Sequence, residues 1–75
     1  MTTLDHLRPG QRGRIHSLRG DTPLVQRLMD LGLFEGEEVE LVGYAPLGDP
    51  IEIRLGNARL SLRRHDAAGI EVLPL

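Results

Sequence analysis

The fold of this protein follows from one stretch of its sequence, residues 51–62, which reads IEIRLGNARLSL. Apolar residues alternate with charged or polar ones on both sides of Gly56-Asn57, and such a pattern around a two-residue turn is typical of a β-hairpin. The predicted register places apolar residues opposite one another, in the pairs Leu55–Ala58, Ile53–Leu60 and Ile51–Leu62. Every apolar side chain of the hairpin then lies on one face, which the rest of the chain must cover.

The same register places two arginines opposite each other on the outer face. Arg54 lies across from Arg59, and like charges in directly opposed positions destabilise a sheet. Glu52 is diagonal to Arg59 and to Arg63, so it can relieve the repulsion and leave an ordinary solvated face. The alternative is that the arginines form a cluster for an acidic partner surface.

Other segments of the chain also predict short strands. Strand-like runs occupy three further ranges, 13–18, 38–44 and 70–73. Gly and Pro separate the runs every few residues, as in small antiparallel proteins with tight turns. Together with the hairpin this makes five strands in a single domain, residues 1–75. We therefore predict a mostly β fold, a small five-stranded barrel, because a sandwich needs more strands and more chain.

An amphipathic helix is predicted after the first strand. Thr22 is the expected N-cap and Pro23 the first helical residue, and Gly32 ends the helix. Apolar residues recur at helical spacing: Leu24, Val25, Leu28, Met29 and Leu31. A helix this short is not stable alone in water, so it must dock on the strands. We expect most of the apolar stripe to be core and keep one edge as a candidate partner surface.

The composition excludes several functional classes. The 75 residues contain no cysteine, which removes disulfides, thiolate zinc sites and cysteine nucleophiles and fits a reducing cytosol. All nine basic residues are arginine, so lysine chemistry is absent as well. A net charge of -2 and a near-absence of aromatic residues argue against nucleic acid as a partner. No apolar run is long enough to insert into a membrane, and no serine lies in a nucleophile elbow. We predict a cytoplasmic binding protein, not an enzyme.

The segment Ala45-Pro46-Leu47-Gly48-Asp49-Pro50 predicts a stiff surface loop, because its prolines remove two backbone donors and restrict the residues before them. A stiff loop loses little entropy on binding, so it can present Leu47 as an apolar anchor and Asp49 as a charge. The candidate partner contacts are therefore Leu47, Asp49 and Arg27, followed by Leu24, Arg54 and Arg59. The alternative is that Pro and Gly only shape the crossover between two strands.

Metal binding has weak support in the sequence. His6, His16 and His65 lie in separate predicted elements, without the spacing of metal ligands. His65-Asp66 is the only adjacent pair of ligand-type residues, and it is the candidate for a weak divalent cation such as iron. No certain cofactor is predicted.

Three stretches resemble the FeoA family, small accessory proteins of bacterial ferrous iron transport. Residues 27–36, RLMDLGLFEG, are similar to its R-L-x-x-L-G-L-x-x-G segment, and residues 45–51, APLGDPI, match its A-P-L-G-D-P-I loop. Residues 62–64, LRR, followed by Ala67, Ala68 and Ile70, are similar to its closing segment. The likeness covers nearly the whole chain.

The resemblance implies an SH3-like barrel with an inserted helix and a cytosolic partner, the ferrous iron permease that carries a guanine-nucleotide-binding domain. It implies an adaptor that docks on the cytosolic part of this permease and modulates iron uptake. Related barrels form the C-terminal domains of iron-dependent repressors, so the alternative is a metal- or peptide-responsive regulatory module. Those repressors add a helical DNA-binding domain, which this sequence does not predict. The oligomeric state is left open.

Overall fold

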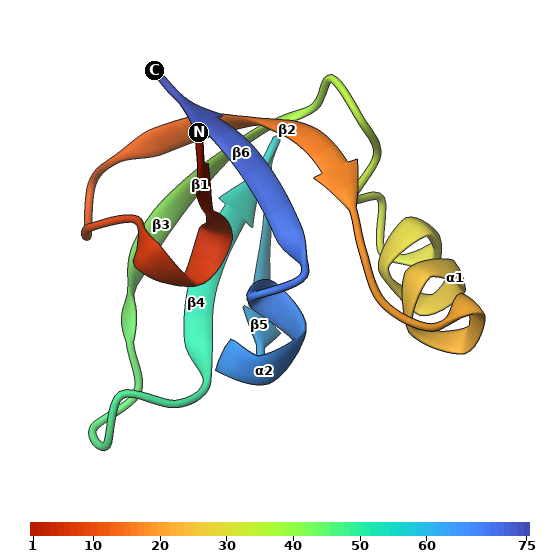
Figure 1. The fold of residues 1–75 in the computed structure, drawn as a ribbon. Helices are drawn as coiled ribbons and strands as arrows, with labels where there is room; N and C mark the ends of the chain where they lie inside the picture. Colours follow the sequence, from red (N-terminus) through yellow and green to blue (C-terminus); the bar gives the residue numbers. More distant parts are fainter.

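The predicted hairpin lies at one end of the sheet (Figure 1) in a computed structural model that describes all residues, 1–75. Strand β4 (Ile51–Leu55) pairs with β5 (Ala58–Leu62) in the predicted register. Five of the six inward side chains are buried or half-buried, whereas Ala58 beside the turn is exposed; the five are Ile51, Ile53, Leu62, Leu55 and Leu60. The alternation of the sequence therefore determines which face of the hairpin meets the core.

Six antiparallel strands form one curved sheet in the order β1-β6-β2-β3-β4-β5. The remaining strands are β1 (Thr2–Thr3), β2 (Arg12–Leu18), β3 (Glu38–Tyr44) and β6 (Ile70–Pro74). The helices are the 3-10 turn η1 (Leu4–His6), α1 (Thr22–Asp30) and the one-turn α2 (Arg64–Ala67). The mostly β barrel architecture is confirmed, with the two-residue β1 added to the five predicted strands. The sheet stays open, because β1 pairs only with β6 and β5 only with β4.

One apolar core fills the inside of the curved sheet. Its 13 buried residues come from every strand except β1 and from all three helices: Leu4, Leu7, Ile15, Leu28, Leu33, Val39, Leu41, Ile51, Ile53, Leu62, Ala67, Ile70 and Val72. No polar or charged residue is buried. Any polar group that acts on a ligand therefore acts at the surface.

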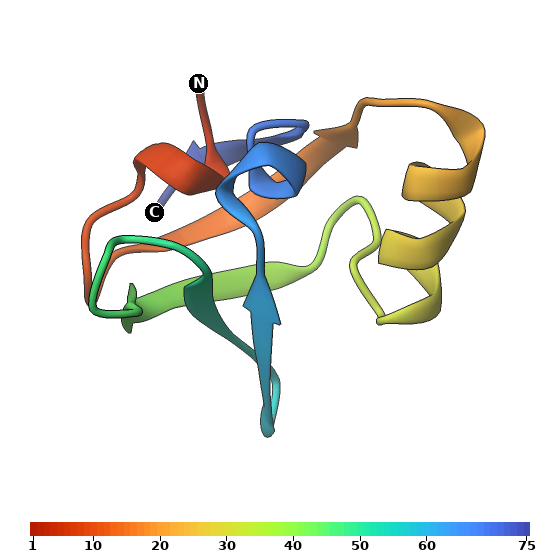
Figure 2. The ribbon, with the colours of Figure 1, turned by 90° about the horizontal axis from the view of Figure 1, so that it is seen from below.

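Helix α1 lies beside the barrel instead of over it (Figure 2). Leu28 is buried and Leu24 packs half-buried against the core, Val25 is half-buried, and Met29 and Leu31 are 37% and 42% exposed, so only part of the predicted stripe is core. The physical reason is that helical periodicity reports which residues share a face, not whether anything covers that face. The nine residues of α1 make it the longest helix, and no helix of the structure could cross a membrane.

The predicted N-cap of α1 was wrong by one position. Asp21, not Thr22, is the N-cap, and its Oδ1 accepts a hydrogen bond from the Leu24 N–H at 2.8 Å. Both residue types are good caps, but the aspartate carboxylate here reaches the third residue beyond it. Pro23 lies in the first turn, but it is the second helical residue instead of the predicted first.

Strands β2 and β6 are joined by side chains at the point where their register shifts. The shift lies between Ile15 and Ser17. Ser17 Oγ donates to Glu71 Oε1 at 2.5 Å, and Arg19 Nε donates to the same oxygen at 3.1 Å. The Ser17 hydrogen bond, aided by the Arg19 charge, lowers the pKa of Glu71, while desolvation acts in the opposite direction.

The end of β2 passes very close to Gly69, the residue before β6. Arg19 N–H donates to the Gly69 carbonyl at 2.6 Å. A Cβ atom at Gly69 would collide with the Arg19 carbonyl oxygen, which belongs to the backbone and cannot swing aside. Glycine is therefore required here for close approach of two chain segments.

Replacing Gly69 with alanine should lower the free energy of unfolding by about 1–3 kcal/mol, because the backbone at Arg19 must shift. Gly43→Ala is the matched control, since an added Cβ there meets nothing within 4 Å. Urea unfolding measures both variants. Equal midpoints for the two would contradict the close approach.

The unfolding free energy should also decrease in acid through Glu71. Because folding lowers its pKa, its stabilising contribution is fully present above the ordinary value of 4.5 and is lost as the pH falls through the folded-state pKa. Ser17→Ala should raise the Glu71 pKa toward 4.5, measured by NMR titration of the side-chain carboxyl. An unchanged pKa in this variant would assign the effect to the charges of Arg19 and His16 instead of the Ser17 hydrogen bond.

Candidate partner-binding site

The loop between β3 and β4 protrudes from the barrel and presents Leu47. This side chain is 96% exposed, more than any other large apolar residue of the chain. Two backbone hydrogen bonds fold the loop onto itself: Ala45 N–H donates to the Pro50 carbonyl at 2.9 Å, and Gly48 N–H donates to the Ala45 carbonyl at 2.7 Å. Leu47 therefore stands on an ordered turn at the surface.

Arg64, the first residue of α2, fastens this loop to the barrel. Its Nε donates to the Gly48 carbonyl at 2.5 Å, and its Nη1 donates to the Asp5 carbonyl at 3.1 Å. Its guanidinium lies over the Tyr44 ring, 4.7 Å from the centroid, as a cation–π contact. The Tyr44 hydroxyl in turn donates to the Leu7 carbonyl at 3.0 Å. One arginine thus joins the loop, the end of β3 and the N-terminal segment.

Asp49 caps helix α2 from the loop. Its Oδ1 accepts the backbone N–H of Arg64 at 3.0 Å, whereas Arg63 at the N-cap position makes no side-chain cap. A capping oxygen satisfies a backbone donor that the helix itself cannot satisfy. Asp49 therefore has a structural contact beside the partner role predicted for it, and an experiment must separate the two.

Four predicted residues meet in one shallow hollow between α1 and α2. Arg27 Nη2 on α1 contacts Asp66 Oδ2 on α2 at 2.7 Å, and this ion pair connects the helices. Leu24 and His65 line the same hollow, which has a volume of about 360 Å³. The β3–β4 loop lies at the other end of the molecule from α1 in both views (Figures 1 and 2). The candidate residues therefore form separate surfaces and not a single site.

The hollow does not fit a resident metal ion. The Asp66 carboxylate is engaged by Arg27, and His65 is an exposed residue without a hydrogen-bond partner. No group of three or more potential ligands gathers anywhere in the structure. A cation would have to displace Arg27 before it could bind Asp66, so the predicted His65-Asp66 pair is not a preformed site.

The hairpin arginines are paired with glutamates. Arg54 lies opposite Arg59 as predicted. Arg59 Nη1 contacts Glu52 Oε2 at 3.0 Å, which is the predicted diagonal relief, and Arg54 Nη1 contacts Glu40 Oε1 on β3 at 3.4 Å. The solvated-face interpretation therefore accounts for both arginines in the unbound protein.

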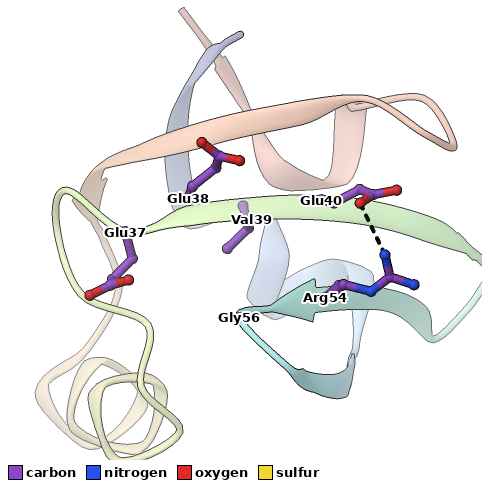
Figure 3. Close-up of a pocket in the computed structure, with 6 residues that line it drawn as sticks. All are labelled: Glu37, Glu38, Val39, Glu40, Arg54 and Gly56. Carbon is purple, nitrogen blue, oxygen red and sulfur yellow. Dashed lines mark hydrogen bonds and ion pairs between the residues drawn. The ribbon is translucent and has the colours of Figure 1, made fainter.

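Arg54 and Glu40 also line a second shallow hollow, of about 280 Å³, beside β3 (Figure 3). Its other lining residues are Glu37, Glu38, Val39 and Gly56. Figure 3 shows Glu40 and Arg54 pointing toward each other, and Glu38 pairs with Arg12 at 3.2 Å, so two of the three carboxylates are neutralised. The third carboxylate, Glu37, forms no ion pair.

Sequence reasoning missed two features of the surface. Arg64 is adjacent to Arg63, and no local signal distinguishes them, because the contacts of Arg64 come from residues 16 and 59 positions away. The other feature is Phe34, which lies beyond the end of α1 and is 44% exposed, and which follows the helix edge that the sequence offered as a candidate partner surface. The available signal for exposed apolar residues was the width of the apolar stripe, which is more than one short helix can bury.

Arg64→Lys should lower the free energy of unfolding by about 1–3 kcal/mol, because lysine keeps the charge but cannot donate to two carbonyls from one planar group. Amide exchange at Gly48 should accelerate, since the loop loses its fastening. Arg63→Lys is the matched control, as the Arg63 side chain is exposed and forms no ion pair. Hydrogen exchange read by NMR compares the two, and equal protection of Gly48 would show that the loop is ordered without Arg64.

The sequence of this chain is similar to that of an iron transport protein. It is 36% identical over 69 residues to the Fe(2+) transport protein A/Fe(2+) transporter FeoB fusion protein of Porphyromonas gingivalis (strain ATCC BAA-308 / W83). The match covers 92% of this chain and 8% of the fusion protein. The chain thus spans a small part of this relative.

Solved structures share the fold. Iron(II) transport protein A from Clostridium thermocellum has a TM-score of 0.89 at 42% identity, over 95% of this chain and 44% of that one. The zinc complex of FeoA from Stenotrophomonas maltophilia, a prokaryotic SH3 domain protein, has a TM-score of 0.82 at 29% identity, over 96% of this chain and 89% of that one. The SH3-like prediction is confirmed. The manganese regulator SloR, at 18% identity and a TM-score of 0.82, shares the fold alone.

The family model of the FeoA domain matches residues 2–74, from β1 to the end of β6. The match includes the proline loop, α1 and the closing segment that suggested the resemblance. This protein belongs to the FeoA domain family.

Proposed function

We propose that this protein is a cytoplasmic accessory domain of ferrous iron transport that binds the cytosolic part of the ferrous iron permease and modulates transport. The observation that carries the proposal is the relative in which a 36% identical domain is fused to FeoB. Fusion holds two domains at a high effective concentration. A FeoA domain that meets the permease as a separate chain needs a binding surface to reach it, and we propose a permease with a guanine-nucleotide-binding domain as this partner.

The loop Ala45–Pro50 has the physical properties of such a surface. Leu47 is almost fully exposed, and its burial against a partner would contribute about 1.5–3 kcal/mol. The hydrogen bonds within the loop and the contacts of Arg64 hold it in one conformation before binding. Little conformational entropy is then lost when a partner covers it.

Two further surfaces support the main one. Leu24 and Arg27 lie on α1, whose exposed apolar end offers a second contact area. Arg54 and Arg59 are held only by exposed ion pairs, which are worth about 0–1 kcal/mol each, so a partner's carboxylates can replace their glutamates. We propose a binding function and no catalysis for all of these residues.

A metal-responsive regulatory module is the other function that the sequence left open. The likeness to SloR is one of fold, and fold alone does not determine function. The FeoA of Stenotrophomonas maltophilia was crystallised with zinc, but here Asp66 is paired with Arg27, and His65 and Asp66 are not joined by a third residue that could complete a metal site. The geometry supports the adaptor better.

Leu47→Ala should weaken binding to the permease's cytosolic part about tenfold or more, because the anchor loses most of its buried area. The matched control is Leu75→Ala, which removes a leucine that is 58% exposed at the C-terminus. Calorimetry or pull-down with the purified permease fragment measures both. Equal affinity of the two variants would remove the loop from the interface, and no binding by the wild type would overturn the adaptor function.

The same assay separates the two roles of Asp49. Asp49→Asn keeps an oxygen that can accept the Arg64 N–H but removes the charge. A loss of affinity with an unchanged unfolding free energy assigns the charge to the partner contact, whereas full affinity assigns Asp49 to the structure alone.

A further inference from the structure

The open edge of the sheet at β5 carries unpaired backbone groups. Strand β5 pairs only with β4, and Leu55 faces Ala58 across the two-residue turn. In such a hairpin this pair is hydrogen-bonded and the pairs then alternate, so the N–H and C=O groups of Arg59 and Ser61 point away from β4. None of the backbone hydrogen bonds outside the helices and strands uses either residue, and both are exposed. Two donors and two acceptors therefore line this edge.

The side chains beside this edge differ on its two faces. Arg59 and Ser61 lie on the outer face, with Arg63 directly after the strand, while Leu60 lies half-buried on the inner face. Arg63 has no carboxylate partner anywhere in the structure, and Arg59 keeps its glutamate only through an exposed ion pair. A strand added here would meet positive charge on one face and apolar surface on the other.

The charge and the apolar surface beside β5 indicate which kind of segment can pair with this edge. A second copy of this chain would bring its own Arg59 and Arg63 to the same face, and the like charges would oppose pairing. An extended segment with alternating acidic and apolar residues has the complementary pattern. We propose that the β5 edge binds such a segment of another protein by adding it as a strand beside β5. The inference shares Arg59 with the surfaces proposed for the permease, but it rests on the backbone edge of β5 and on Arg63, and it uses neither Leu47 nor α1.

A capped peptide of about eight residues that alternates Glu and Val tests the proposal, with a Lys–Val peptide of the same length as its counterpart. In NMR titrations the Glu–Val peptide should bind saturably, shift the Arg59 and Ser61 amides and slow their exchange with solvent at least tenfold. The Lys–Val peptide should not bind. Shifts confined to the β3–β4 loop or to α1, or equal binding of the two peptides, would overturn the proposal.

Single substitutions of exposed arginines test the charge contact with the peptide, and they are not expected to unfold the protein. Arg63→Gln should weaken Glu–Val binding about two- to fivefold, the range expected for one exposed ion pair. Arg8→Gln, which removes another exposed arginine without an ion pair, should leave it unchanged, and so should Leu47→Ala. Equal affinity of the Arg63 and Arg8 variants, or dimerisation through β5 in the absence of peptide, would overturn the assignment. Leu47→Ala affects only the loop. The β5 proposal can therefore fail in the peptide titration while the permease proposal stands, and the permease proposal can fail while peptide binding at β5 stands.

Discussion

The contacts of the Arg64 guanidinium are the constraint on which the functional surface depends. The group donates to the Gly48 and Asp5 carbonyls and covers the Tyr44 ring. It thereby connects the first turn of the chain, the end of β3 and the loop that follows it. A planar group with several fixed donors can make these contacts at once, which a flexible ammonium cannot do. Arg64, together with the hydrogen bonds within the loop, keeps in place the turn on which the exposed Leu47 stands.

The molecule divides into a well-packed barrel and a loosely attached helix. The strands pair through backbone hydrogen bonds around the core, whereas α1 contributes one buried side chain, Leu28, the half-buried Leu24 and one ion pair, Arg27–Asp66. Elements with few buried contacts open locally at lower free energy than the core. We expect α1 to be the most adaptable part of the surface and the β3–β4 loop the most preorganised one.

The parts of the fold that were predictable are those that local patterns determine. The hairpin register follows from strict alternation around a two-residue turn, and the exposed loop follows from the prolines at 46 and 50. The burial of α1 was predicted only in part, because its apolar periodicity does not say what packs on it. The N-cap was ambiguous between Asp21 and Thr22, since either residue type can cap.

The candidate site was predictable only in part, for the same reason. The exposure of Leu47 depends on its own loop and was anticipated, whereas the pairing of Arg27 with Asp66 joins residues 39 positions apart. Arg64 acts through contacts even farther along the chain. No local pattern reports which distant carbonyl or carboxylate an arginine will meet.

The pairing of β1 with β6 has a consequence for how this domain combines with others. Thr2 lies opposite Val72, so the two ends of the chain emerge close together at one edge of the sheet (Figure 1). A linker attached at either end would hold the barrel in nearly the same place and orientation. One orientation of the barrel is therefore compatible with gene fusion at either end and with a separate polypeptide.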